Sequence, residues 1–499
     1  MAAREADVIV VGGGGSGLSA AIEAATLGCS VAVLEKNPAT GGSTIMSVGS
    51  FAATGTAHQR RKGIEDSAQD HFEDLGLLNE SEMQSRWKGY PNVDNLDLRR
   101  ILVENAGETL AWLESMGVRF FGPVLEPPHR RPRMHNVLPN SRAYGYWLLR
   151  RARRLGVAIH AGHRVRALLR EGERVVGVEA QAPDGSRRRF IARAGVVLAC
   201  GDWSSGRKMK RRYVRPELAD MSASCNPANT GDLHEPVMAL GGTILNPHMA
   251  VARVRFVPPP LDGFVHKLPP WRPLTWFMQW AMDHLPARIL RPFIMSFLTT
   301  VLEAQPSLYE DGAILVNALG ERFCDELDEP EFAIARQPDQ RAYIVFDDRV
   351  ARMYSAFPHF ISTAPGIAYA YVPDYRRSRP DLFHSAETIE GLARSLGADP
   401  EKLRAAILKA RPTAAPPIKS APFYALGPVS CFVRGVEGGL AIDTDFRIVD
   451  VGGAPIEGLF GAGLFGQGGL MLEGHGQHLS WAFTSGRLAG RSAARRARS

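Results

Sequence analysis

The sequence predicts an α/β fold whose main domain is doubly wound around a parallel sheet. Residues 8–11 are apolar and β-branched, which is typical of a buried parallel strand. Three glycines spaced as G-x-G-x-x-G follow directly, and residues 18–27, rich in Ala, Leu and Ile, then predict a helix. A second apolar run over residues 30–34 ends at Glu35. Strand, glycine turn, helix, strand and acid occur in the order of a Rossmann-like dinucleotide-binding unit.

Each part of this unit has a physical role in binding a dinucleotide. Gly12 allows the tight turn, Gly14 lets the backbone approach a pyrophosphate, and Gly17 lets the helix pack closely against the strand. The N-terminus of the helix offers unpaired N–H groups and a positive dipole end to the phosphates. Glu35 can accept hydrogen bonds from a ribose hydroxyl.

Length and composition indicate a globular enzyme. The chain has 499 residues, 45% hydrophobic and 22% charged, which is enough for two or more domains. Its five cysteines are scattered without a CxxC pair, so we expect a reducing compartment and no metal site. The first residues lack a signal-peptide layout, and no run of 18 uncharged apolar residues occurs. We therefore expect a cytoplasmic protein.

The chain is basic, with a formal net charge of +7. Arginines cluster in residues 130–133, 150–154, 187–189 and 491–498. Such surfaces can attract nucleic acid or anionic lipid, but solvated helix faces are the more ordinary interpretation. No nucleic-acid-binding motif accompanies the charge, so we expect no nucleic acid partner.

Nucleotide-site features recur at both ends of the chain. Residues 41–44, GGST, can place amides and hydroxyls near a cofactor. Residues 195–202 predict a strand that ends in a small-residue turn, and residues 458–464 again predict a strand followed by glycine, before a last helix over 480–495. A β-meander is expected at residues 164–169, 174–182 and 187–192. This arrangement indicates one domain interrupted by an insertion.

With these motifs the sequence resembles the superfamily of FAD-dependent fumarate reductases, succinate dehydrogenases and 3-ketosteroid dehydrogenases. Further carriers of the resemblance are VVLACGD, NTGD, GAILVNALGERFCDE, PFYA, EGGLAIDTDFRI and GLFGAG. The resemblance implies an FAD-binding domain formed by residues 1–242 and 434–499, with an inserted α+β cap at 243–433. It also implies hydride exchange between flavin and a carbon beside a carbonyl-activated carbon, while a protein group moves the α-proton. We therefore expect an FAD-dependent oxidoreductase acting on CH–CH bonds.

The resemblance and the fingerprint together identify candidate FAD-binding residues. Residues 44–49 contain no histidine, although membrane-bound respiratory members carry FAD covalently there, so we expect non-covalent FAD. No CxxCH haem motif occurs, so electrons are expected to pass to an external acceptor. The candidates are Gly12, Gly14, Gly15, Ser16, Gly17, Glu35, Lys36, Gly41, Gly42, Ser43, Thr44, Ser47, Gly49, Val165, Ala199, Cys200, Gly201, Asp232, Gly463, His478 and Leu479.

Departures from the family point away from dicarboxylates. Residues 327–332 lack the arginine that fumarate reductases place after RF.NE, and their late arginine falls on Glu473. Because two carboxylates need bidentate cations, we expect an apolar, ketone- or steroid-like substrate or a monocarboxylate. Three alternatives stay open: a fumarate-reductase-like enzyme on a carboxylate substrate, an FAD oxidase or hydroxylase, and a degenerate flavoprotein fold without activity.

Five residues are candidates for catalysis. His475 lies in the loop that the family places beside the flavin, and Tyr309 takes the position of the family's relay arginine. His248 matches a family histidine at the start of the cap, and Arg434 lies in the hinge segment. A phenol or imidazole can move the α-proton, and the N–H of Gly476 can polarise a substrate carbonyl. For each side chain a purely structural role is the alternative.

An aromatic insertion at residues 253–302 has no counterpart in short family members. Prolines divide it into expected helices at 274–285 and 286–302. Three interpretations stay open: a buried cap or homo-oligomer surface, a peripheral contact of 271–302 with the inner face of a membrane, and a hydrophobic substrate mouth. Its aromatic residues are Trp271, Trp276, Phe277, Trp280, Phe293 and Phe297, interspersed with Arg272, His284, Arg288 and Arg291.

Overall fold

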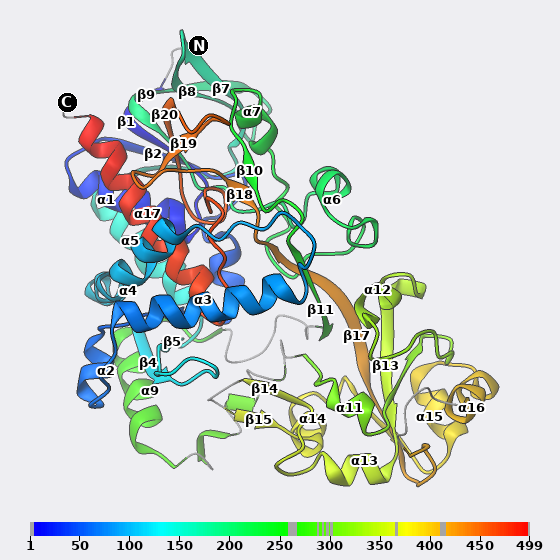
Figure 1. The fold of residues 1–499 in the computed structure, drawn as a ribbon. Helices are drawn as coiled ribbons and strands as arrows, with labels where there is room; N and C mark the ends of the chain where they lie inside the picture. The colour runs from blue at the N-terminus through cyan, green and yellow to red at the C-terminus, as the bar shows by residue number, and fades with distance from the viewer. Residues whose placement is uncertain are drawn as a thin grey trace.

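The computed structural model describes residues 4–257, 267–286, 289–291, 294–295, 299, 303–364, 368–409 and 416–497. The chain is built around two larger sheets, one in the nucleotide-binding part and one in the cap (Figure 1). Phe293, Phe297 and Arg288, singled out from the sequence, lie outside the described residues. Within the described ranges, no helix is both long and apolar enough to cross a membrane.

The larger sheet has the strand order β19-β20-β9-β1-β2-β6, and β20, β9, β1, β2 and β6 run parallel. The chain passes from β1 through α1 to β2 on one side, while β9 lies on the other side of β1. Ligands bind at such a switch point, beyond the carboxyl ends of the strands. The bounds are β1 Arg4–Val11, α1 Gly15–Thr26, β2 Val31–Leu34, β6 Ala158–His160, β9 Arg187–Leu198, β19 Arg447–Val449 and β20 Pro455–Gly461.

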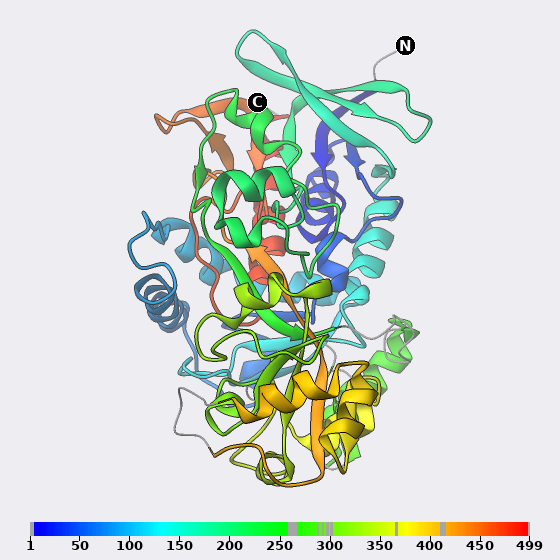
Figure 2. The same cartoon turned by 90° about the vertical axis from the view of Figure 1, so that its right-hand side faces the viewer.

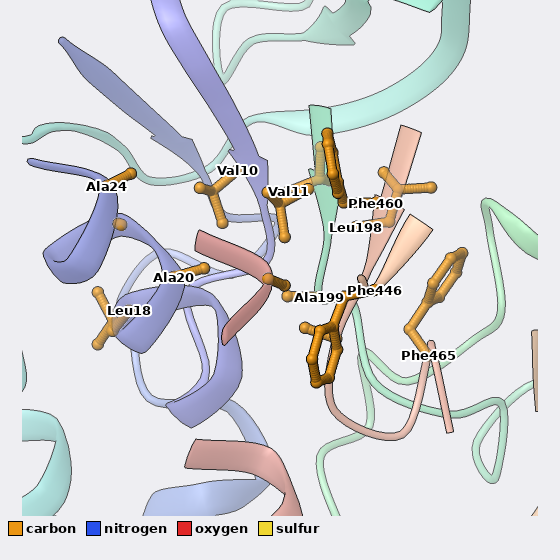
Figure 3. Close-up of a cluster of buried hydrophobic side chains, with 14 of the residues drawn as sticks. Val10, Val11, Leu18, Ala20, Ala24, Leu198, Ala199, Phe446, Phe460 and Phe465 are labelled. Carbon is orange, nitrogen blue, oxygen red and sulfur yellow. The ribbon is translucent and has the colours of Figure 1, made fainter. Parts of the chain in front are cut away.

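A continuous apolar core joins this sheet to its helices. Helix α17, Gln477–Arg496, packs along α1, and α5, Arg142–Arg154, packs on the other flank of α1. Figure 3 shows Val10 of β1, Leu198 of β9 and Phe460 of β20 meeting in this core. Because the carboxyl-terminal halves of β1 and β9 are buried on both faces, their sequences there form apolar runs rather than alternating patterns.

A three-stranded sheet and long helices extend the nucleotide-binding part. Helix α9 docks on β4 of this sheet, where Gln279 donates from Nε2 to the carbonyl oxygen of Phe120 at 2.9 Å (Figure 1). The insertion therefore packs against the nucleotide-binding part of the fold. The bounds are β3 Ser50–Ala52, β4 Arg119–Val124, β5 Met134–Leu138, α2 Ala57–Arg61, α3 Ala68–Gln84, α4 Leu96–Met116 and α9 Arg272–His284.

The cap is built on an antiparallel sheet of order β11-β17-β13-β12, with β16 also paired to β17. Figure 2 shows this part below the parallel sheet, with yellow helices packed beside the long orange strand β17. The bounds are β11 Ala250–Phe256, β12 Ile314–Asn317, β13 Arg341–Phe346, β16 Phe383–Ala386, β17 Phe423–Val436, α11 Ser307–Glu310, α12 Pro330–Ala335, α13 Asp348–Met353, α14 Val372–Ser378, α15 Ile389–Leu396 and α16 Pro400–Leu408.

The α/β fold class with a parallel sheet is confirmed, and several element limits differ from those predicted. Helix α1 begins at Gly15, three residues before the predicted start, because the glycine turn itself enters the helix. The meander strands β7, Arg164–Glu171, and β8, Arg174–Gln181, pair as expected, but β9 runs on to Leu198 without a break at residue 192. Strand β17 crosses the predicted boundary at 433, and the division into domains stays a prediction.

Candidate active site

A cavity of about 410 Å³ lies beyond the carboxyl ends of β1 and β9, where the switch point predicts a ligand. Every candidate FAD-binding residue except Gly17, Gly41 and Gly463 lines it. His475, Gly476 and Arg434 line the same cavity, so the structure brings three of the five catalytic candidates to the expected cofactor residues. Asn229 of the NTGD motif also lines it, as do Asn226 and Arg255, which were not among the residues predicted from sequence.

The three fingerprint glycines are required for different reasons. A Cβ on Gly12 would lie 2.3 Å from the carbonyl oxygen of Ala199, and a Cβ on Gly17 would lie 1.9 Å from that of Gly12. Both positions are therefore close backbone contacts. A Cβ on Gly14 would meet only the oxygen of Gly41, at 3.9 Å, and would otherwise project into open cavity. This cradle at Gly14 fits the close approach of a pyrophosphate.

Two helices point their N-termini at this cavity without a capping side chain. Helix α1 starts after Gly14 and helix α17 starts after Gly476, and neither has a side-chain cap hydrogen bond. Their first-turn N–H groups and dipoles favour negative charge. Gly463 packs closely against the N-terminus of α1, since a Cβ on Gly463 would lie 2.6 Å from Oγ of Ser16. The cavity therefore fits an anionic, elongated dinucleotide such as FAD.

Glu35 is held rigidly at the cavity wall. Its two carboxylate oxygens accept hydrogen bonds from the backbone N–H groups of Gly13 and Asn37, both at 2.7 Å. Burial raises the pKa of Glu35, although these bonds oppose the shift. Each carboxylate oxygen has a second lone pair, so Glu35 can still accept from a ribose hydroxyl.

Asp232 organises the charged rim of the cavity. It accepts from Arg164 at 2.7 and 2.8 Å, from Thr230 at 2.6 Å and from Lys36 at 3.1 Å. Burial raises the pKa of Asp232, but the bonds from Arg164 and Thr230 and the charge of Lys36 outweigh it and bring the pKa to about 2. Asp232 is therefore an ionised anchor for two cations that line the cavity.

His475 is paired with Glu126, a residue that sequence reasoning missed. The backbone N–H of His475 donates to Oε2 of Glu126 at 2.9 Å, and Nδ1 of its ring contacts Oε1 of the same carboxylate. Burial raises the pKa of Glu126, but the hydrogen bond and charge of His475 outweigh it, so the net pKa lies below its ordinary value. An ionised Glu126 therefore fixes the orientation of the imidazole.

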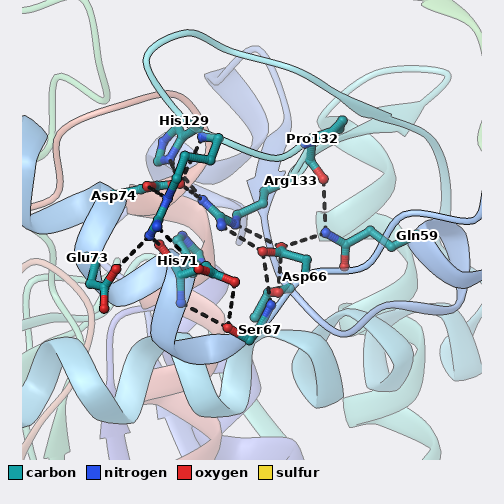
Figure 4. A network of polar contacts seen from close by, with 12 residues as sticks. Gln59, Asp66, Ser67, His71, Glu73, Asp74, His129, Pro132 and Arg133 are labelled. Atoms are coloured by element: carbon teal, nitrogen blue, oxygen red, sulfur yellow. Dashed lines mark hydrogen bonds and ion pairs between the residues drawn. The ribbon is translucent and has the colours of Figure 1, made fainter.

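A buried polar network holds the loop that carries Glu126 (Figure 4). Arg133 is 2% exposed and pairs with Asp66 at 2.6 Å and with Asp74 at 2.5 Å. His71 of α3 lies 3.1 Å from the side-chain nitrogen of Gln477, and burial lowers its pKa to about 3, so it stays neutral. The network ties α3 to the segments on both sides of the Glu126–His475 pair.

His478 and Glu437 form a second histidine–carboxylate pair at the cavity. Nε2 of His478 lies 2.5 Å from Oε1 of Glu437, and Gln467 donates to Oε2 of Glu437 at 2.7 Å. Burial raises the pKa of Glu437, but the charge and hydrogen bond of His478 outweigh burial, so the net pKa lies well below its ordinary value. His478 is therefore oriented by a carboxylate, as His475 is.

The structure does not place Tyr309 or His248 at the cavity. Tyr309 is 7% exposed and packs in the apolar core of the cap, where burial raises its pKa far above the ordinary value. His248 stacks on Tyr90 with ring centroids 4.6 Å apart, and its Nε2 lies 3.0 Å from Oδ1 of Asn92. Both are packed as structural side chains because their rings are fully engaged by neighbours away from the cavity.

Two arginines from the cap sheet also reach the cavity. Arg434 of β17 and Arg255 of β11 both line it. Nη2 of Arg434 and Nε of Arg255 are buried without a hydrogen-bond partner among the residues that the structure describes. Arg255 and Arg253 share one carboxylate, Glu303, at 3.7 and 3.4 Å. Arg434 was already a candidate from the sequence. For Arg255 the only sequence signal was its alternation with Arg253 along one strand.

The family model for the FAD binding domain matches residues 7–266 and 274–470. This chain belongs to that family. It is 28% identical to NADH:fumarate oxidoreductase of Klebsiella pneumoniae (strain 342), over 100% of this chain and 48% of that protein. It is 27% identical to urocanate reductase of Eggerthella lenta, over 92% of this chain and 69% of that protein. The chain thus spans about half the length of the first relative.

Solved structures show the same fold. The open conformation of a flavocytochrome c3 fumarate reductase superposes with a TM-score of 0.74 at 24% identity, over 99% of this chain and 79% of that chain. A 3-ketosteroid delta1-dehydrogenase from Sterolibacterium denitrificans superposes with a TM-score of 0.66 at 20% identity, over 99% and 100%. The predicted superfamily and cofactor are confirmed, and the protein is an FAD-dependent oxidoreductase.

Proposed function

We propose that this enzyme reduces or dehydrogenates a CH–CH bond beside a carbonyl in an apolar compound that carries a single carboxylate. The observation that carries the proposal is the pair Arg255 and Arg434, which both line the flavin cavity. Among the described residues, Nη2 of Arg434 is buried without a hydrogen-bond partner, and Nε of Arg255 makes only a long ion pair of 3.7 Å with Glu303. Buried guanidinium N–H groups without a protein acceptor are costly, so a ligand oxygen is the natural partner. One such arginine pair suits one carboxylate.

Apolar side chains support the rest of this substrate description. Met46, Val48, Leu464, Phe465 and Leu479 line the same cavity. Apolar walls with a few convergent polar groups are typical of sites for small organic molecules. Fumarate, named for one relative, has two carboxylates, whereas urocanate, named for another, has one. The arginine arrangement favours a substrate with one carboxylate. A neutral ketone- or steroid-like compound is the alternative that the apolar lining favours.

Bound FAD supplies hydride exchange, and the protein supplies the proton and the orientation. His475 moves the α-proton, because its imidazole lines the cavity and can act as a general acid or base. Glu126 keeps its ring in one orientation. The N–H of Gly476, at the uncapped end of α17, holds the carbonyl oxygen as negative charge develops there.

Three further proposals concern the cofactor and its partners. FAD is held non-covalently, because residues 44–49 offer no histidine. Acid precipitation should therefore release the yellow colour into the supernatant, and colour retained in the pellet contradicts this. Electrons exchange with an external partner, because the sequence holds no haem motif. Cytoplasmic localisation and homo-oligomerisation stay predictions.

The test follows flavin absorbance after anaerobic reduction of the holoenzyme. We expect benzoylacrylate, an aryl enone with one carboxylate, to reoxidise the flavin faster than its methyl ester or fumarate. Arg434→Gln and Arg255→Gln should each raise KM for benzoylacrylate by about 10–100-fold, the usual loss for a hydrogen bond to a charged group, and leave the ester unaffected. Arg253→Gln is the matched control, since Arg253 shares Glu303 with Arg255 but does not line the cavity.

Two results would overturn this assignment. Faster reoxidation by the methyl ester than by the acid would favour the neutral ketone alternative. Faster reoxidation by fumarate would place this chain with the dicarboxylate reductases.

A further inference from the structure

A second large pocket, of about 760 Å³, lies away from the flavin cavity at the C-terminal ends of α1, α4, α5 and α17. Its floor and walls include Trp112, Trp147 and Met116. Among the described residues that line it, Glu23 is the only acidic one, and it is already paired with Arg487 and Arg491. The pocket is therefore strongly electropositive. Its arginines are Arg150, Arg151, Arg154, Arg272, Arg491 and Arg495.

Most of these arginines do not serve internal ion pairs. Arg151, Arg154 and Arg495 have no acidic partner within the described ranges of the chain. The guanidinium carbons of Arg150 and Arg272 each lie 5.5 Å from the ring centre of Trp147. The unpaired cations therefore surround an aromatic wall and leave their N–H groups for an external anion.

Helix dipoles account for only part of this arrangement. Arginines in the last turns of α5 and α17 are favoured there by the negative end of each helix. Arg272 is the first residue of α9, where the positive end of the dipole disfavours a cation. Its placement over Trp147 brings a sixth arginine to the pocket from a different part of the chain, which indicates a ligand rather than a helix cap.

An exposed aromatic face continues directly from the pocket. A smaller pocket connects the arginine pocket to this aromatic face. It is lined by Tyr146 and Trp271 together with Arg150, Arg154 and Arg272. Helix α9 buries its other face on β4, so its aromatic face points outward. Trp271 is 63% exposed, Trp276 59%, Phe277 55% and Trp280 42%. None of these four residues lines the flavin cavity, so this aromatic face is separate from the lining of that cavity.

We propose that this face docks the enzyme on a membrane that contains anionic phospholipids. The arginine pocket binds lipid phosphates, and the aromatic residues of α9 lie among the head groups. Tryptophans at the head-group level and arginines on the adjoining polar surface are the combination that holds peripheral proteins at an interface. Positive charge alone or aromatic exposure alone gives only weak anchoring, and this face has both. The inference does not depend on the identity of the substrate.

Vesicle co-sedimentation of the full-length holoenzyme tests the proposal. We expect binding to vesicles of equal parts phosphatidylcholine and phosphatidylglycerol at low salt, weaker binding at high salt, and none to phosphatidylcholine alone. Removing the unpaired arginines in the double variant Arg151→Gln/Arg154→Gln should lower partitioning by about 10–30-fold, from the usual contribution of each basic residue near an anionic surface. Arg187→Gln/Arg189→Gln, on the exposed end of β9, removes the same charge elsewhere and should change partitioning little.

The aromatic contribution is tested separately. Trp276→Ser/Phe277→Ser should also weaken binding, while Leu408→Ser, at an equally exposed position of α16, should not. Flavin content and flavin reduction rate, measured in every variant, show that the fold is intact.

Four outcomes would overturn the proposal: no vesicle binding at low salt, equal binding to neutral vesicles, equal loss in the β9 control variant, or no loss in the α9 aromatic variant. Displacement from vesicles by millimolar inorganic phosphate would assign the pocket to a small soluble anion. Tighter binding of a DNA oligonucleotide at the same salt would assign the face to nucleic acid.

Discussion

Asp232→Asn is expected to destabilise the protein by removing the charge that anchors two cations at the cavity rim. Asn is nearly isosteric and keeps one acceptor oxygen, so the change removes the ionic part of the contacts with Arg164 and Lys36. The pKa of Asp232 falls from its ordinary 3.8 to about 2 in the folded protein. At about 1.36 kcal/mol per pH unit this corresponds to at most about 2.4 kcal/mol.

Solvent reduces that value. The side chain of Asp232 is 20% exposed and that of Arg164 is 38% exposed, so screening lowers the expected loss to about 1–2 kcal/mol. Because the folded-state pKa is depressed, this stabilisation is complete above about pH 4 and is lost as the pH falls toward about 2. The difference between parent and variant should therefore be largest near neutral pH and shrink in acid.

Urea unfolding, followed by tryptophan fluorescence at about pH 7 and about pH 3, measures this difference. Each curve is recorded without FAD and with saturating FAD, because a loss seen only with FAD reports weaker binding instead of a lost ion pair. Asp184→Asn is the matched control: its pKa is also lowered to about 2, by hydrogen bonds from Ser186, but the group is exposed. A loss of equal size in the control, or one independent of pH, would refute the reasoning.

Three further predictions follow from the site. Glu126→Gln should keep FAD but slow flavin turnover by about 10–100-fold, the usual effect of losing a group that orients a functional histidine. A parent-like turnover rate would show that the pairing of Glu126 with His475 is not used. Tyr309→Phe should turn over at the parent rate, because the phenol is buried in the cap, and a large fall would contradict its placement. Gly14→Ala should fold with weakened FAD binding, whereas Gly17→Ala should not fold, as circular dichroism and flavin absorbance will show; a folded, yellow Gly17→Ala protein would contradict the 1.9 Å contact.

Local sequence spacing predicted the nucleotide-binding part of the fold. The strand, glycine turn, helix and second strand occupy consecutive residues, so each is encoded by its own propensity and period. Gly12 and Gly17 were identifiable because close backbone contact excludes a side chain at these two positions. The division of this part between both ends of the chain was also visible, since each end carries strand-then-glycine motifs.

Pairings between distant residues were not predictable in this way. Glu126 and His475 are 349 positions apart, and only the packing of their loops brings the carboxylate to the imidazole. Arg255 lies in the aromatic insertion, where its alternation with Arg253 does not reveal that the strand faces the flavin cavity. The same limit applied to Tyr309, whose family position suggested catalysis although its ring is buried in the cap.

The sequence by itself determined the fold class and the dinucleotide-binding glycines, because these depend on short-range spacing and on steric limits at single residues. The identity of the cofactor, FAD, came from the resemblance to a known family. Tertiary structure alone decided which histidines received a carboxylate, which arginines line the flavin cavity, and that the arginines of three helices, α5, α9 and α17, gather beside the exposed face of α9. These features depend on how separate elements are placed in space. The burial and the charged neighbours of each side chain are fixed only when the elements pack together.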